Sequence, residues 1–296
     1  MQQILRNVNI EPYNIKNFSK FGLFRQKIDS KFKIGEQLTN KHNLYQQKRD
    51  IFLKFNDNYI KTYNKDIDIN DINNNYDVLK KFNYFIVGSD QVWNYNIKSL
   101  FELNFLPFSN SNNKIAFAAS LCVNSIPNKF KTYYKDNLSK FKAISMREYK
   151  GKKILEKLLH KEITTVIEPI LMIERNERQK IMVKPKKKIS KYYLTDPCEF
   201  IYLMKNAEFV ITDSYHAAIF SIIFNKRCRL YKRKKEYRGM NCRIDTIKEL
   251  LKLEKNSYLK NGIKYIEFIY KNDIYKNKKI IQEKINAINF LKDNLK

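Results

Sequence analysis

The sequence predicts an α/β fold in which helices cover a mainly parallel sheet. From residue 82 onward, short apolar runs rich in β-branched and aromatic residues alternate with segments of helical period, and this alternation is typical of βαβ units. The runs, such as Phe-Asn-Tyr-Phe-Ile-Val at 82–87, are nearly continuous, which indicates strands buried on both faces. With 296 residues, 43% of them hydrophobic, the chain can bury a substantial core in one or two domains.

The predicted elements follow in order along the chain. Residues 1–80 are polar and weakly patterned, with helical spacing over 44–55 and a predicted loop over 64–75. The predicted strands are 82–87, 114–119, 143–146, 163–167, 209–212 and 229–231. The predicted helices are 131–141, 152–160, 199–206, 216–224, 244–253 and 277–291. The last helix has apolar residues along one face, which predicts that it docks on a folded lobe.

One charged segment predicts a domain boundary. Residues 173–191 are rich in lysine and lack a convincing strand. The sequence therefore predicts an N-terminal lobe over 1–172, a Lys-rich linker over 173–191 and a shorter C-terminal lobe over 192–275. A closing helix over 276–296 completes the predicted organisation.

The chain is strongly basic. Lys and Arg total 58 against 30 Asp and Glu, so the formal net charge is +28. A basic surface attracts nucleic acid, anionic lipid or phosphorylated substrates. The scarcity of Gly (6), Pro (6) and Trp (1) beside abundant Lys, Asn and Ile favours a second explanation, a genome poor in G and C. Charge alone therefore assigns no partner.

Several classes of protein are excluded by what the sequence lacks. It has no apolar run near the roughly 20 residues of a membrane-spanning helix and no signal-peptide pattern, so we expect a cytoplasmic protein. The four cysteines, at positions 122, 198, 228 and 242, form no CxxC pair, which argues against a disulfide scaffold and a zinc site. No GxGxxG or GxxxxGKS phosphate loop is present, which argues against nicotinamide enzymes and P-loop NTPases.

The first candidate site is the polar segment 88–94, Gly-Ser-Asp-Gln-Val-Trp-Asn, which follows the first strong strand. Ligands of parallel α/β sheets bind outside the carboxyl ends of the strands, so Ser89 and Asp90 are candidates. The alternative is a turn in which Gly88 supplies backbone freedom, the polar residues cap a helix and Trp93 packs in the core.

A second candidate follows the strand at 209–212. Asp213 or Ser214 can cap the apolar helix that comes next, and His216 then lies at the start of this helix. The alternative is a histidine bonded to a backbone carbonyl. The other two histidines, His42 and His160, lie in charged helical contexts typical of solvent-facing positions.

A third candidate is Arg147, beside Glu148 at the end of the strand over 143–146. Its planar fork suits a carboxylate or a phosphate, and the alternative is a surface salt bridge. The basic run 232–235, Lys-Arg-Lys-Lys, follows another strand and could reach a phosphate, the alternative being a solvated loop. Because Arg147 and His216 both follow buried strands, we expect them to face one cleft.

Taken in order, these segments resemble the polysaccharide pyruvyl transferase family. The resemblance spans roughly residues 45 to 255, and Gly-Ser-Asp-Gln-Val-Trp-Asn together with Ser-Tyr-His at 214–216 is its most specific part. The matching segments are 84–94, 114–120, 144–148, 167–169, 206–216 with 220–226, and 241–244.

The resemblance implies two Rossmann-like lobes of glycosyltransferase-B type. It also implies transfer of pyruvate, as a ketal, from phosphoenolpyruvate to a sugar of a bacterial surface glycan or its precursor. By resemblance, His216 is the acid/base and Arg147 the anion clamp, because an imidazole moves protons near neutral pH and an arginine holds anions. A further basic residue is expected within 232–235. The substrate-binding candidates are Ser89, Asp90, Ser120, Ser214, Lys226 and Arg243.

The resemblance also defines the expected partners and location. Phosphoenolpyruvate is the donor substrate, no cofactor or metal is expected, and the acceptor is a glycan or a lipid-linked sugar. A lipid-linked acceptor implies work at the inner face of the membrane, with peripheral contact to anionic lipid. No specific nucleic acid is expected, since the chain has no helix-turn-helix, zinc-finger or RRM signature.

The chain departs from the family pattern at several points. We expect the family's N-terminal strand, with its Asn-Tyr-Gly-type loop, and part of the second lobe to be missing. Ala217 stands where Gly is common, and Leu121-Cys122 replaces a Phe-Gly pair. Two alternatives therefore remain beside the enzyme. One is a truncated, inactive remnant that still binds sugar or phosphate, and the other is a basic nucleic-acid-binding protein.

Overall fold

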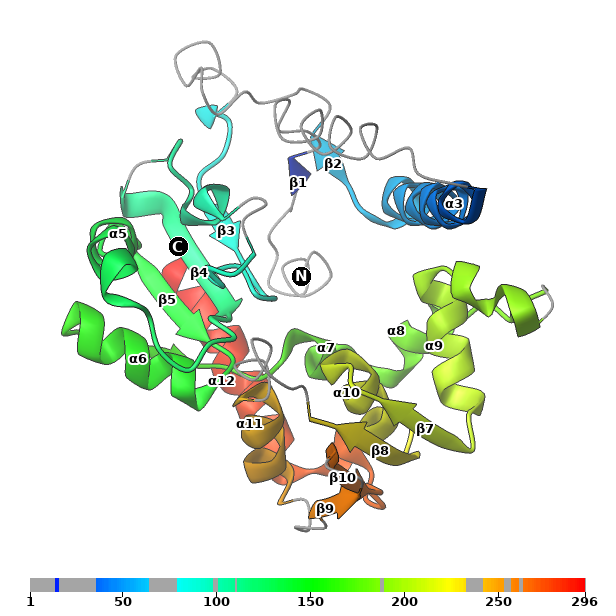
Figure 1. Ribbon diagram of the computed structural model, residues 1–296. Coiled ribbons are helices and arrows are strands. Elements are labelled where there is room, and N and C mark those ends of the chain that lie inside the picture. Colours follow the sequence, from blue (N-terminus) through cyan, green and yellow to red (C-terminus); the bar gives the residue numbers. More distant parts are fainter. Residues whose placement is uncertain are drawn as a thin grey trace. The chain divides into compact units, whose positions relative to one another are not determined.

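The computed structural model describes residues 14–15, 36–63, 79–97, 101–109, 111–186, 189–232, 242–252, 257–260 and 263–295. These residues form an α/β structure (Figure 1) that contains a parallel four-stranded sheet, which confirms the predicted fold class. The described residues fall into two compact units. The first unit comprises those within 78–174 and 207–296, and the second unit those within 2–77 and 175–206.

The first sheet of the first unit contains the strands of the predicted parallel layer. Its order is β3 (Phe85–Val87), β4 (Lys114–Ala119), β5 (Ala143–Met146) and β6 (Thr164–Thr165), and every pair is parallel. All six residues of β4 are buried, as expected for an apolar strand with neighbours on both sides and both faces covered. All four carboxyl ends therefore lie at one edge of the sheet.

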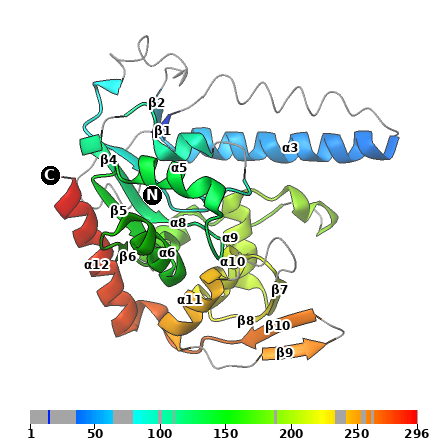
Figure 2. The same ribbon diagram turned by 60° about the vertical axis from the view of Figure 1, so that its left-hand side comes forward.

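Helices lie on both faces of the first sheet (Figures 1 and 2). Helices α5 (Asn128–Leu138) and α6 (Tyr149–Leu159) cover one face, and α12 (Lys278–Asn294) covers the other. On the α12 side, the ring centroids of Phe117 and Phe290 are 6.3 Å apart. Leu138 and Leu155 are fully buried on the other helices, so the apolar stripe of each helix faces the sheet.

Trp93 is a core residue in the connection between β3 and β4. Its side chain is fully buried, its indole Nε1 donates a hydrogen bond to the Asn104 carbonyl at 3.0 Å, and its ring meets Phe141 edge-on. The 3-10 helices η1 (Glu102–Phe105) and η2 (Ser111–Asn113) complete this connection. The packing interpretation of Trp93 is therefore correct.

The second sheet, also in the first unit, is mixed. Its order is β7 (Phe209–Thr212), β8 (Arg227–Tyr231), β10 (Ile263–Phe268) and β9 (Ser257–Lys260). The β7–β8 pair is parallel, whereas β10 runs antiparallel to both β8 and β9. The sequence did not predict β9 or β10, so the expectation of a mainly parallel arrangement is wrong for this half of the second sheet. The division into two lobes of glycosyltransferase-B type stays a prediction.

Two helices cover one face of the second sheet. Helix α10 (Tyr215–Ile223) follows β7, and α11 (Cys242–Leu251) follows the connection after β8. Ile219 and Ile247 from these helices meet Leu230 and Ile266 from the strands around one small apolar cavity. Burial of these side chains holds the start of α10 at a defined place beside the end of β7.

The second unit contains the long helix α3 (Glu36–Tyr59), α8 (Arg175–Ile181), η3 (Ile189–Leu194) and α9 (Pro197–Asn206). A two-residue parallel pair, β1 (Asn14–Ile15) with β2 (Thr62–Tyr63), belongs to the same unit. Lys48 of α3 lies over the ring of Tyr193 at 4.2 Å. The segment 173–191 thus contains helix α8 as well as part of η3, and its domain role as a linker stays a prediction.

The remaining elements of the first unit are short. Helix α7 (Pro169–Met172) follows β6, and η5 (Ile274–Lys276) precedes α12.

Cys122, Cys198 and Cys228 are free, buried thiols. Across the described part of the chain, no helix combines the length and apolar character needed to cross a membrane. Nor do any three His, Cys, Asp or Glu side chains in these ranges gather as metal ligands would.

Candidate functional site

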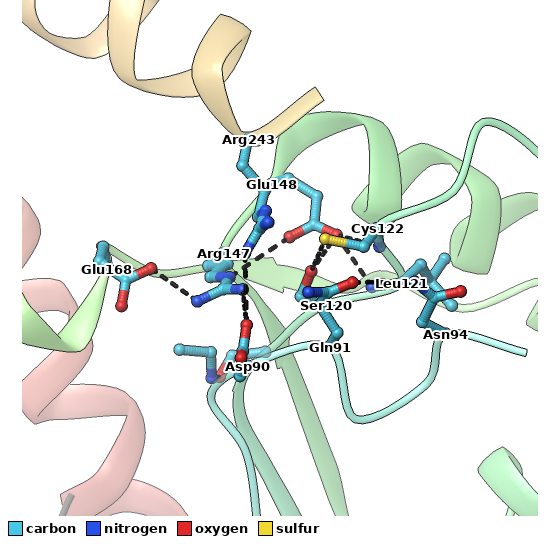
Figure 3. A network of polar contacts seen from close by, with 12 residues as sticks. Asp90, Gln91, Asn94, Ser120, Leu121, Cys122, Arg147, Glu148, Glu168 and Arg243 are labelled. Carbon is cyan, nitrogen blue, oxygen red and sulfur yellow. Dashed lines mark hydrogen bonds and ion pairs between the residues drawn. The ribbon is translucent and has the colours of Figure 1, made fainter. Parts of the chain in front are cut away.

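Each strand of the first sheet is followed by a polar residue at its carboxyl end. Asp90 follows β3, Ser120 follows β4, Arg147 follows β5 and Glu168 lies shortly after β6. Because the strands are parallel, these residues converge at one edge of the sheet (Figure 3). This is the edge at which α/β sheets bind ligands. We call Asp90, Arg147, Glu148, Glu168 and Arg243 the arginine–carboxylate cluster.

Gly88 makes the turn that brings Asp90 to this edge. Its φ is +141°, and a Cβ atom at this position would lie 1.9 Å from the carbonyl oxygen of Phe117 in the neighbouring strand. No residue with a side chain can take this place without moving β4. The predicted role of Gly88 in supplying backbone freedom is therefore correct.

Arg147 is the centre of the cluster. Its side chain has no exposed surface, Nη2 lies 2.7 Å from Asp90 Oδ1 and Nη1 lies 2.8 Å from Glu168 Oε2. The two terminal nitrogens of the guanidinium fork thus bind two different carboxylates. Burial lowers the pKa of Arg147, but the charges around it, that of Glu168 first, outweigh burial and the net shift is upward. The alternative of a surface salt bridge is wrong for Arg147.

Asp90 connects Arg147 to a second arginine. Arg243 at the start of α11 places Nη1 3.3 Å from Asp90 Oδ1, and 58% of the Asp90 side chain is exposed. Burial raises the pKa of Asp90, but the charges of Arg147 and Arg243 outweigh it and the net shift is downward. An ionised Asp90 therefore lies between two guanidinium groups at the exposed side of the cluster.

Glu148 binds the turn after β4 from inside the protein. Its Oε1 accepts hydrogen bonds from Ser120 Oγ at 2.8 Å, Leu121 N at 2.9 Å and Cys122 N at 3.2 Å. Its other oxygen lies 3.9 Å from Arg147 Nε. Full burial raises the pKa of Glu148. Ser120 is itself fully buried, so it supports the cluster rather than facing an open site.

The second sheet contributes Tyr215 and His216 from the start of α10. Ser214 is the N-cap, and its side chain accepts a hydrogen bond from Ala217 N at 3.4 Å, which confirms the predicted cap. The buried Tyr215 ring has the guanidinium carbon of Arg147 5.4 Å from its centroid and that of Arg243 at 4.7 Å. Burial raises the pKa of Tyr215 well above its ordinary value.

His216 lies in the electrostatic field of the same cluster. Burial lowers the pKa of the half-buried His216 imidazole; Glu168 and Asp90 raise it, and Arg147 and Arg243 lower it. The net shift is downward. A histidine with a lowered pKa is mostly neutral at pH 7 and can accept a proton.

Buried polar atoms that lack a hydrogen-bond partner gather in this cluster. Among the described residues, five buried side-chain nitrogen or oxygen atoms have no hydrogen-bond partner. Four of them belong to Arg147 (Nε), Glu148 (Oε2), Glu168 (Oε1) and Arg243 (Nε). Such atoms are rare in folded proteins. Their concentration at one sheet edge indicates a place where water or a ligand completes the hydrogen bonding.

The structure does not bring Lys226 to the cluster. The β7–β8 register pairs Phe209 with Arg227 and Thr212 with Leu230. Lys226 therefore precedes β8 at the edge opposite to the one where β7 ends and Ser214 begins α10. Lys232 follows β8 at the nearer edge, and the rest of the basic run, 233–235, lies outside the described residues. Ser89 follows Gly88 at the cluster edge.

Sequence reasoning did not select Glu148, Glu168 or Tyr215 as site residues. Glu148 and Glu168 each come within a few residues of a predicted strand end, which is the signal that also selected Asp90. Tyr215 also comes three residues after a predicted strand, 209–212, but an aromatic residue at a helix start is common in cores. Its position between two arginines follows only from the packing of α10 and α11.

Fold and site together define an α/β protein with a buried arginine–carboxylate cluster and a nearby histidine at the carboxyl edge of a parallel sheet. The family model described as polysaccharide pyruvyl transferase matches residues 1–234. The chain belongs to the polysaccharide pyruvyl transferase family, as the resemblance predicted. No curated protein and no solved structure matches the chain.

Proposed function

We propose that this protein transfers pyruvate, as a ketal, from phosphoenolpyruvate to a sugar of a bacterial surface glycan or its precursor. Family membership supports the reaction class. The observation that carries the proposal is the place of His216 at the start of α10: its ring is 5.5 Å from that of Tyr215, and the Tyr215 ring lies beside Arg147 and Arg243 of the arginine–carboxylate cluster. There His216 can carry a proton, and the two cations Arg147 and Arg243 can attract the anionic groups of a substrate.

The proposed reaction joins two sugar hydroxyls to the central carbon of phosphoenolpyruvate. One hydroxyl oxygen attacks this carbon while the methylene carbon gains a proton and becomes a methyl group. The second hydroxyl then replaces phosphate, which leaves with its bonding electrons. Of the two hydroxyl protons, one ends on the methyl group and the other on phosphate. We assign the transfer of the first proton to His216, whose lowered pKa favours the neutral, proton-accepting form.

We assign the anionic groups of the donor to Arg147 and Arg243. Both guanidinium groups already bind Asp90, so direct contact with a donor carboxylate or phosphate requires Asp90 to leave. Asp90 is the partner best suited to do so, because 58% of its side chain is exposed whereas Glu168 is buried. In this proposal, Ser89 and Ser214, at the two strand ends, contact substrate as well.

The proposed donor and acceptor also suggest where the protein works. Phosphoenolpyruvate is made inside the cell, and a lipid-linked sugar is presented at the inner face of the membrane. We therefore propose a cytoplasmic protein that meets its acceptor at that face, helped by attraction between its net charge of +28 and anionic lipid.

The first experiment measures phosphate release from phosphoenolpyruvate with and without a panel of sugar acceptors. We expect release only with a suitable acceptor, and we expect His216→Ala to reduce it by about 10²- to 10⁴-fold, the usual contribution of an acid/base group. His42→Ala, which changes a histidine of α3 in the second unit, is the matched control. A loss below about tenfold for His216→Ala would contradict the role of this residue.

A second variant tests the arginine. Arg147→Lys keeps the positive charge but cannot bind two carboxylates through one planar fork. We expect a strong loss of activity, on the order of 10²-fold or more, together with correct folding by circular dichroism. Activity within about threefold of the unsubstituted protein would show that the fork of Arg147 has no part in the reaction.

The alternative of an inactive remnant has one specific observation in its favour. The guanidinium group of Arg147 already binds two carboxylates, Asp90 and Glu168, so its positive charge is compensated without a ligand. Calorimetry with phosphoenolpyruvate separates the two proposals. Binding with turnover supports the transferase, whereas the absence of turnover across a broad acceptor panel, together with the absence of binding, supports the remnant.

A further inference from the structure

A pocket with basic walls lies in the groove between α5 and α6 in the first unit. Its volume is about 450 Å³, which is within the range of small-molecule sites. Lys131 and Lys135 of α5 line it, with Lys157 of α6 and His160, the residue that ends α6. None of the residues lining this pocket belongs to the arginine–carboxylate cluster, so this is a separate place on the molecule.

The cations around this pocket are not neutralised by the described part of the protein. No Asp or Glu is among the described residues that line it. The acidic residue of α6 that forms an ion pair, Glu156, is bound to Lys152 at 3.5 Å. Three lysines around one pocket whose lining includes no carboxylate give it a positive potential that attracts an anion.

The start of α5 contributes positive potential, and the end of α6 at His160, which lines the same pocket, contributes carbonyl groups of the opposite sign. Ser125 and Ile126, which precede this helix, form part of the pocket wall, and the N-cap residue Pro127 offers no side-chain hydrogen bond to the first turn. A helix start without a side-chain cap presents N–H groups and the positive end of the helix dipole. Helical side chains also lean toward the N-terminus, which directs Lys131 and Lys135 toward this end.

The pocket has an apolar part as well. Ile126, Ile154 and Leu158 line it, and Ile126 is buried. An inorganic ion would leave these side chains without a partner, whereas an organic group attached to the anion would cover them. Lysine binds phosphate as a point charge, and the three oxygens of a phosphate can each accept a hydrogen bond from a different lysine.

We propose that the groove between α5 and α6 binds an organic phosphate, with the phosphate between the lysines and the organic group on the three apolar side chains. The proposal does not depend on the transferase reaction. Such a ligand could be a soluble phosphomonoester or the headgroup of a phospholipid. The pocket's limited volume favours the soluble form.

The test uses phenyl phosphate as the soluble probe and inorganic phosphate as its comparison, each titrated into the full-length protein. We expect calorimetry to give at least about tenfold tighter binding of phenyl phosphate. In a ¹H–¹³C spectrum, phenyl phosphate should shift the ring signals of His160, because this ring lines the pocket. With three histidines in the chain, these signals can be assigned by substitution.

Matched charge variants separate the pocket from general basicity. Lys131→Gln with Lys157→Gln should weaken phenyl phosphate binding at least tenfold. Lys129→Gln with Lys153→Gln removes the same charge from the same two helices at exposed positions outside the pocket and should change affinity less than twofold. Equal weakening by both pairs, or an unshifted His160 signal, would overturn the proposal.

Two further outcomes have defined meanings. Inorganic phosphate binding as tightly as phenyl phosphate would overturn the assignment of an organic ligand. Vesicles of phosphatidylcholine containing phosphatidic acid test the other source, a phospholipid headgroup. If the protein binds these vesicles through Lys131 and Lys157 but does not bind phenyl phosphate, the assignment of a soluble ligand is overturned. His216→Ala should still bind phenyl phosphate at this pocket, so failure of the transferase proposal leaves this result unchanged.

Discussion

Arg147 and Glu148 are adjacent in the sequence but stabilise different parts of the site. Arg147 reaches outward along the sheet edge to Asp90 and Glu168, whereas Glu148 reaches back to the turn after β4. A buried carboxylate of this kind is retained only with good hydrogen-bonding partners, and the turn supplies three. The pair therefore holds the carboxyl ends of all four strands in one geometry.

Gly88 offers a direct test of the close approach between β3 and β4. Gly88→Ala should destabilise the protein by on the order of 3 kcal/mol or more, because the new Cβ would overlap the Phe117 carbonyl and the backbone would remain at φ +141°. Urea denaturation followed by circular dichroism measures this loss.

Gly151→Ala is the matched control for that experiment. Its new Cβ would meet side-chain atoms, the Met146 methyl at 2.6 Å and the Glu148 Cγ at 3.0 Å, and no backbone carbonyl, and alanine is the better helix former. We expect a clearly smaller loss of stability than for Gly88→Ala. An equal loss would show that the contact with Phe117 is not the cause.

Lys114 predicts a pH dependence of stability. Burial, together with the charge of Lys140, lowers the pKa of Lys114 from 10.5 to about 8. Between these values the unfolded chain binds a proton that the folded protein has released, so this lysine makes stability rise with pH across that window. From pH 7.5 to 9.5 the gain should be about 2 kcal/mol.

Lys114→Met removes this dependence. The free energy of unfolding of the unsubstituted protein should rise relative to that of Lys114→Met as the pH increases from 7.5 to 9.5. Lys81→Met, which removes an equal charge from an exposed position, controls for the change in net charge. Parallel stability curves for the unsubstituted protein and Lys114→Met would contradict the assignment.

At the scale of elements, the start of α12 has a side-chain cap with two hydrogen bonds. Asn277 accepts a hydrogen bond from Ile280 N at 3.1 Å and donates one to the hydroxyl of Tyr270 at 2.7 Å. Asn277→Ala should cost about 1 to 2 kcal/mol in the free energy of unfolding. Asn289→Ala, at an exposed position within the same helix, should be neutral or slightly stabilising. Similar losses for both variants would show that Asn277 does not act as a cap.

At the scale of the whole first unit, Arg243 and Asp90 connect the two sheets. They are 153 positions apart in the sequence and 3.3 Å apart in space. A double-mutant cycle with Asp90→Asn and Arg243→Met, measured by denaturation, should give a coupling energy of about 0.5 to 1.5 kcal/mol. Strictly additive losses would show that the two sheets are not joined through this pair in solution.

The local elements were largely predictable because burial leaves a periodic trace in the sequence. The continuous apolar runs predicted the strands of the first sheet, and polar residues directly after them predicted Asp90 and Arg147 as site candidates. The Ser214 cap was likewise visible, since capping depends on neighbouring residues. The antiparallel strands β9 and β10 were not predicted, because their residues, Ser-Tyr-Leu-Lys and Ile-Lys-Tyr-Ile-Glu-Phe, include charged positions and form no continuous apolar run.

By itself, the sequence determined the α/β class, the helix and strand periods and the family, because each depends on residues close together in the chain. Only the tertiary structure decided which strands are neighbours and which strand ends meet. The pairing of β3, β4, β5 and β6 brought Glu168 to Arg147, and the register of β8 placed Lys226 at the opposite edge. Side-chain periodicity reports which face is buried, whereas strand order and register come from contacts between distant segments.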